Sequence, residues 1–66
     1  MDPVTKAVIE TIGDVGYTVM VGADEDGRPH VEATDVKTGE LFIVGADDLY
    51  TAVIELAEQV GIDLEG

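Results

Sequence analysis

The side chains best suited to chemistry in this chain are carboxylates, and three of them stand together at Asp24, Glu25 and Asp26. Oxygen ligands bind hard cations such as calcium, and the Asp-x-Asp-Gly order ending at Gly27 resembles the start of a calcium-binding loop. The rest of such a loop, including its final bidentate glutamate, is missing. An acidic hairpin tip that aids solubility explains the same residues, so cation binding is the weaker interpretation.

Nucleophilic catalysis requires a nucleophile, a base and an orienting group within hydrogen-bonding reach. The chain has no cysteine and no serine, and His30 is its one histidine. Paired carboxylates need a pocket that shifts their pKa values, and a domain of 66 residues has little room for one. We expect His30 to be a surface strand residue near Glu32 or Asp35. The sequence therefore predicts a protein that is not an enzyme, with no catalytic residue, cofactor or metal ligand.

The charge of the chain is strongly one-sided, with 15 acidic and 3 basic side chains and a formal net charge of −12. Phosphates need lysine and arginine to neutralise them, so direct binding to nucleic acid or to an anionic membrane is disfavoured. Two interpretations stay open. The acids form a solvated surface, suited to solubility or to a salt-rich cytoplasm, or they imitate the phosphates of a nucleic acid.

The apolar content is normal for a folded domain, at 45% of the residues. No apolar run approaches the ~20 residues of a membrane span, and the first residues are not the basic start of a secretory signal. We therefore expect a cytoplasmic protein. A chain this short buries only roughly 60% of its unfolded surface, and without cysteine it has no disulfide to stabilise it. Formation of a homodimer is the usual alternative source of stability.

Helical spacing marks both ends of the chain. Asp2 and Pro3 suit the cap and first turn of a helix that is expected to end at Gly13 and Gly16. A second helix is predicted to begin at Asp47 as its cap and to end at Gly61, which suits a left-handed residue. The predicted buried positions are Val4, Ala7, Val8, Thr11 and Ile12 in the first helix, and Leu49, Ala52, Val53, Leu56, Ala57 and Val60 in the second.

Three strands are predicted between the helices, over 17–23, 30–37 and 40–44. Their short connections imply an antiparallel meander. Each helix has one broad apolar stripe to bury, so both should cover the same face of the sheet. The expected fold is a single small α+β domain over 1–66, in the order α-β-β-β-α, with a frayed tail over 63–66.

The second predicted strand contains an irregularity. Val31 and Ala33 share one face of the strand, but Val36 falls out of phase with them. This break predicts a bulge or a twist near Thr34–Asp35. Gly39 follows in a tight turn, where it is free to adopt a positive φ.

The order α-β-β-β-α over nearly the whole chain resembles that of the double-stranded RNA-binding domain, and residues 27–30 (Gly-Arg-Pro-His) look like the short loop before that family's second strand. The family grips phosphate with basic residues at the start of its second helix, where this chain has Ala46, Asp47 and Asp48. Only His30 matches, and one histidine beside acids does not hold a duplex. The resemblance therefore implies the architecture without RNA binding.

Alternation along the strands predicts a sheet face that no helix covers. If Val19, Val21, Leu41 and Ile43 face the helices, six residues face outward: Thr18, Met20, Glu32, Thr34, Phe42 and Val44. Within this set Met20, Phe42 and Val44 would form an apolar patch, which is typical of a contact surface. A shift of one residue in the strand register would exchange the two faces.

The sequence thus predicts a small acidic, non-catalytic interaction protein that binds a protein partner or itself through its open sheet face. One alternative is a nucleic-acid mimic that blocks a basic groove of a DNA- or RNA-handling protein. The weaker alternative is an acidic hairpin that binds a cation.

Overall fold

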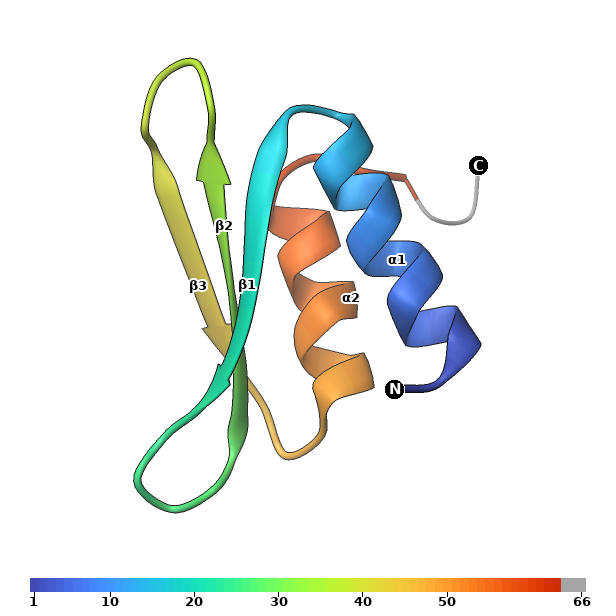
Figure 1. The fold of residues 1–66 in the computed structure, drawn as a ribbon, viewed down its shortest axis with the longest axis vertical. Helices are drawn as coiled ribbons and strands as arrows, with labels where there is room; N and C mark the ends of the chain where they lie inside the picture. The colour runs from blue at the N-terminus through green and yellow to red at the C-terminus, as the bar shows by residue number, and fades with distance from the viewer. Residues whose placement is uncertain (64–66) are drawn as a thin grey trace.

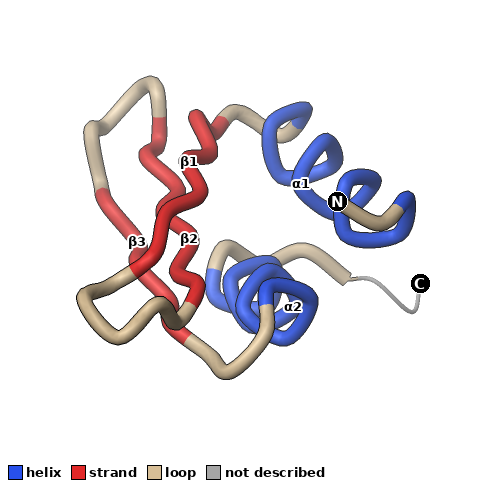
Figure 2. Tube along the Cα trace, turned by 60° about the horizontal axis from the view of Figure 1, so that its bottom comes forward, coloured by secondary structure: helices blue, strands red, loops and turns tan. Residues whose placement is uncertain are grey.

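The computed structural model describes residues 1–63 and has the expected order of elements. These are α1 (Pro3–Asp14), β1 (Tyr17–Ala23), β2 (Pro29–Asp35), β3 (Leu41–Gly45) and α2 (Leu49–Gln59). The strands form one antiparallel sheet in the order β1-β2-β3, and both helices lie on the same side of it (Figure 1, Figure 2). The predicted α+β architecture is confirmed. Of the tail expected to fray, residues 64–66 lie outside the described residues.

Helix α1 begins where its capping residue predicts. One carboxylate oxygen of Asp2, Oδ1, accepts hydrogen bonds from the amides of Val4 and Thr5, both at 3.0 Å. The other, Oδ2, accepts the Thr5 hydroxyl at 2.6 Å. Because this hydroxyl is satisfied locally, Thr5 is buried together with Val8 and Ile12. The apolar stripe predicted through Val4, Ala7 and Thr11 is wrong, since those three side chains are exposed.

Helix α2 has the same type of cap one residue later than predicted. The amide and hydroxyl of Thr51 donate to Asp48 at 2.8 and 3.0 Å, so Asp48 and not Asp47 is the cap. At the other end, Gly61 has φ +85° and its amide donates to the Glu58 carbonyl at 3.1 Å. The Ile62 amide donates to the Ala57 carbonyl at 2.9 Å, which completes a Schellman motif and confirms the predicted ending.

The sheet pairs without a bulge. Residues of β1 and β2 face each other one to one, from Tyr17 opposite Asp35 to Ala23 opposite Pro29, so the bulge predicted near Thr34–Asp35 is absent. Strand β2 ends at Asp35 because its Oδ1 accepts the amides of Lys37 and Thr38, at 2.8 and 3.2 Å, and turns the chain.

The same turn confirms the prediction for Gly39, which has φ +78°. Val36 appears out of phase because it lies in this turn, beyond the end of β2, and it is exposed.

The core lies between the sheet and the helices. Helix α2 packs over β2 and β3, and α1 packs against β1 and α2. Val31 and Ala33, predicted to share a face, are fully buried together with Ile12, Val53 and Leu56. The central strand β2 therefore carries the best-covered part of the sheet.

Strand β3 is turned opposite to the prediction. Val44 is buried and Phe42 packs against the core, with its ring edge-on to that of Tyr17 at 6.1 Å between centroids. Leu41 and Ile43 face away from the helices. The register explains this, because Phe42 lies opposite Ala33 and Val44 opposite Val31, and paired residues of neighbouring strands share a face.

Candidate functional site

The face of the sheet opposite the helices, here called the outer face, is the surface most clearly available for contact. No element within residues 1–63 covers it (Figure 1, Figure 2). Its side chains form three rows across the strands. The rows are Thr18–Thr34–Leu41, Met20–Glu32–Ile43 and Gly22–His30–Gly45.

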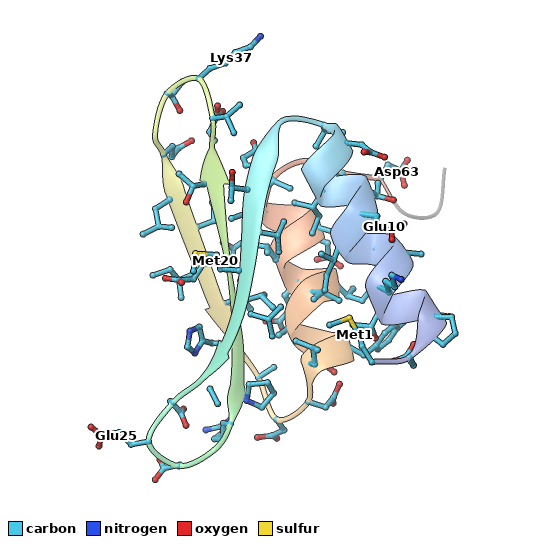
Figure 3. All side chains as sticks on the ribbon, in the orientation of Figure 1. Met1, Glu10, Met20, Glu25, Lys37 and Asp63 are labelled. Atoms are coloured by element: carbon cyan, nitrogen blue, oxygen red, sulfur yellow. The ribbon has the colours of Figure 1, made fainter. Side chains whose placement is uncertain are left out.

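Three large apolar side chains on this face are exposed to solvent. Met20 is 63% exposed, Ile43 56% and Leu41 52%, and Met20 lies on the side of the sheet away from the helices (Figure 3). We call these three residues the outer patch. Strands β1 and β3 carry the patch, and the polar residues Glu32 and Thr34 of β2 run between them. An apolar surface of this kind, built on a paired sheet, is suited to contact with another protein.

The structure brings together four of the six residues predicted for this face. Thr18, Met20, Glu32 and Thr34 lie there, whereas Phe42 and Val44 lie on the helix side. The predicted apolar patch of Met20, Phe42 and Val44 is therefore wrong in two of its three members, and Leu41 and Ile43 take their place.

A signal for the correct face exists in the turn between β2 and β3. Asp35 and Gly39 both suit a tight turn, and its closing hydrogen bond runs from the Asp35 amide to the Glu40 carbonyl at 2.8 Å. Once Asp35 opposes Glu40, counting back along the pair places Phe42 beside the buried Ala33.

Glu32 places an uncompensated charge at the centre of this surface. Within residues 1–63, one salt bridge is formed, between Arg28 and Asp47 at 2.7 Å, and it lies outside the outer face. The Lys37 side chain is at the tip of the turn between β2 and β3 (Figure 3). Glu32 thus stands between Met20 and Ile43 as a carboxylate available to a cation from outside the chain.

His30 occupies one end of the outer face as a half-buried strand residue, in the same strand as Glu32. Its imidazole lies over Gly22, since a Cβ atom at Gly22 would be 2.9 Å from both Cε1 and Nε2 of the ring. A side chain at Gly22 would displace the ring, so the glycine lets the imidazole lie close to the backbone of β1. With Gly22 and Gly45 on either side, His30 is the one side chain with a Cβ in its row.

The acidic hairpin tip is held by hydrogen bonds from backbone amides to the Asp24 side chain. Asp24 Oδ1 accepts the amides of Asp26 and Arg28 at 2.9 and 3.0 Å, and Gly27 has φ +81°. Glu25 projects from the tip of this connection (Figure 3). In residues 1–63, no group of three histidine, aspartate or glutamate side chains is placed to hold a metal ion. The carboxylate of Asp24 therefore stabilises the turn.

Comparison of the chain with models of known protein families, with curated proteins and with solved structures finds no match. The likeness to the double-stranded RNA-binding domain thus consists of the order of elements, and the start of α2 carries Asp47 and Asp48. Among the described residues, no helix is long and apolar enough to span a bilayer.

Proposed function

We propose that this chain is a non-catalytic binding domain that holds a protein partner against its outer face. The observation that carries the proposal is the outer patch, three large apolar side chains at least half exposed on a sheet face that the described chain leaves uncovered. Burial of apolar surface contributes about 25 cal/mol per Å², so a partner that covers Met20, Leu41 and Ile43 gains affinity from each of them.

The residue types support binding over catalysis. The chain lacks cysteine and serine, and its one histidine, His30, packs over Gly22. The polar residues of the outer face are suited to a different role. Thr18, Thr34 and Glu32 alternate with the apolar ones and offer hydrogen-bonding groups that fix the orientation of a partner.

The charge favours a different protein over a second copy of the chain. Two copies would bring together two net charges of −12, and like charges facing each other oppose association. A positively charged partner is attracted by the same field. We therefore place a basic protein partner ahead of a homodimer.

The test compares two substitutions of the same kind on opposite sides of the molecule. Ile43→Asp puts a charge into the outer patch, whereas Val4→Asp puts one at an equally exposed apolar position on α1, 58% exposed against 56%. Each variant and the unchanged protein are immobilised, and proteins retained from a cell lysate are quantified by mass spectrometry. We expect a set of proteins held by the unchanged protein and by Val4→Asp but lost with Ile43→Asp.

The control is circular dichroism, which must give the same spectrum for all three proteins. Retention of the same proteins by Ile43→Asp and by the unchanged protein would contradict the proposal. Sedimentation velocity of the purified chain separately reports whether the face binds a second copy.

A further inference from the structure

Strand β3 leaves one row of backbone groups without a partner in the sheet. The Asp35 amide donates to the Glu40 carbonyl at 2.8 Å, and the Ala46 amide donates to the Pro29 carbonyl at 3.3 Å. In an antiparallel ladder the direction of these groups alternates with each residue. The amides and carbonyls of Leu41, Ile43 and Gly45 therefore point away from β2, at an edge where no other strand of residues 1–63 lies (Figure 1).

This edge lacks the features that normally prevent another chain from pairing with it. Strand β3 (Leu41–Gly45) contains no charged residue and no proline, and it pairs with β2 without a bulge. Backbone groups and side chains act together here, because Leu41 and Ile43 belong to the outer patch and also carry free backbone groups. On β1 the same alternation gives free backbone groups to Val19 and Val21, whose side chains are on the helix side.

The charges around β3 indicate which kind of segment would pair with this strand. Glu40 precedes the strand, Asp48 follows it, and Glu32 stands next to Ile43 in the middle row of the outer face, whereas Asp47 is already paired with Arg28. A second copy of the chain would bring the same acids to the same edge. A segment with lysine or arginine would bring opposite charges instead.

We infer that the β3 edge binds an extended, lysine- or arginine-bearing segment of a partner protein as a fourth strand of the sheet. The inference rests on the proposed function and names the partner's chemistry. Backbone hydrogen bonds to Leu41, Ile43 and Gly45 hold the segment. A residue opposite Ile43 lies about 10 Å from Glu32, two strand spacings away, and a lysine or arginine side chain reaches over Ile43 to its carboxylate.

Gly45 provides a variant that acts on the edge alone. Its amide points outward, so Gly45→Pro removes one free donor and places a ring on the edge without breaking a bond to β2. The outer patch keeps all its side chains. Gly45→Ala is the matched control, because a Cβ at this position would be 4.0 Å from the Pro29 carbonyl oxygen and the amide is retained.

The probe is an end-blocked nine-residue peptide that alternates lysine and valine, with a fluorescent label for anisotropy. We expect Gly45→Pro to weaken its binding roughly tenfold and Gly45→Ala to leave it within about twofold, since a backbone hydrogen bond and access to the edge are lost only in the first. Glu32→Gln should weaken binding about threefold. In NMR spectra the peptide should shift the amides of Leu41, Ile43 and Gly45.

Two further peptides complete the experiment. A peptide with glutamate in place of lysine should not bind, and one with alternate amides methylated should lose binding because it cannot pair with the edge. The inference would be overturned if the methylated peptide bound as tightly as the unmodified one, or if the unmodified peptide bound Gly45→Pro as tightly as the unchanged protein. It would also be overturned if the free protein formed a dimer that Gly45→Pro abolishes. The methylated peptide decides the matter even if Gly45→Pro fails to fold.

The same assay separates this inference from the proposed function. If Met20→Ala weakens binding and Gly45→Pro does not, the outer face binds and the edge does not, so only the strand addition is wrong. If neither variant changes the binding, the peptide binds elsewhere and the strand addition is wrong, while retention by Ile43→Asp still decides the proposed function.

Discussion

Phe42 and Ile43 are neighbours in β3 that face opposite sides of the sheet, so they report directly on which face is buried. Phe42 packs against the core and the Tyr17 ring, whereas Ile43 is 56% exposed. We expect Phe42→Ala to lower the free energy of unfolding by about 2–3 kcal/mol and Ile43→Ala by about 0.5 kcal/mol or less. Urea denaturation measures both. Equal losses, or a larger loss for Ile43→Ala, would contradict the placement of β3.

Asp2 gives the molecule a specific response to acid. The hydrogen bond from the Thr5 side chain, then that from the Thr5 amide, lowers the pKa of the Asp2 carboxyl below its ordinary value. A carboxyl with a lower pKa in the folded state stabilises the fold above the pKa of the unfolded chain, about 3.9, and this contribution is lost as the pH falls through the folded value. The unchanged protein should therefore melt at a higher temperature than Asp2→Asn, and this difference should be largest near neutral pH and should shrink below about pH 4.

Thr5→Val is the control for this response, since it removes the hydroxyl donor and keeps the shape of the buried side chain. In that variant the pKa of Asp2 should move back toward its ordinary value when followed by NMR. An Asp2 carboxyl that titrates alike in both proteins would argue against the cap as its cause.

At the scale of the element, two adjacent aspartates before α2 have separate roles. Asp48 accepts both the amide and the hydroxyl of Thr51, whereas Asp47 forms an exposed salt bridge with Arg28. We expect Asp48→Ala to lower the free energy of unfolding by about 1 kcal/mol, and Asp47→Ala by less than about 0.5 kcal/mol, because exposed ion pairs contribute little. Thermal unfolding of the two variants compares them directly. A larger loss for Asp47→Ala would restore Asp47 as the cap.

The elements that sequence predicts best are those with a local chemical marker. The first helix starts at Asp2-Pro3 and the second ends at Gly61 because a cap and a left-handed glycine each act within a few residues. Both helices also begin with the same Asp-x-x-Thr arrangement, at Asp2 and at Asp48. That repeat is the signal that distinguishes Asp48 from Asp47, and it is visible in the sequence.

The face of β3 lacks such a marker. Leu41, Phe42, Ile43 and Val44 are four consecutive apolar residues, so no polar position shows which side faces water. In β1 and β2, outward-facing residues alternate regularly with residues that face the helices. The outward-facing set was therefore predictable as Thr18, Met20, Glu32 and Thr34. The turn that closes at Asp35 and Glu40 decides the rest, because it sets which residues of β2 and β3 lie opposite each other.

At the scale of the whole molecule, the net charge and the outer patch have opposite effects on association with other molecules. The principal dimensions of 32 × 26 × 16 Å confine a net charge of −12 to a small volume. Apolar side chains on one open face favour association, while the surrounding acids oppose association with anything acidic. Under the proposed function, this combination would select a partner by its charge first and by apolar contact second.

Salt should act on stability and on binding in opposite directions. At about 0.01 M salt the Debye length is about 30 Å, close to the longest dimension of 32 Å, so nearly all the acids repel one another. At about 1 M it falls to about 3 Å, and that repulsion is screened. We expect the melting temperature to rise by about 5 °C or more across this range, while affinity for the lysine–valine peptide falls. Sucrose in place of salt should raise the melting temperature without weakening the binding of the peptide. A melting temperature that stays constant or falls with salt would mean that repulsion between the acids does not destabilise the fold. An affinity for the peptide that does not change with salt would mean that apolar contact alone selects the partner.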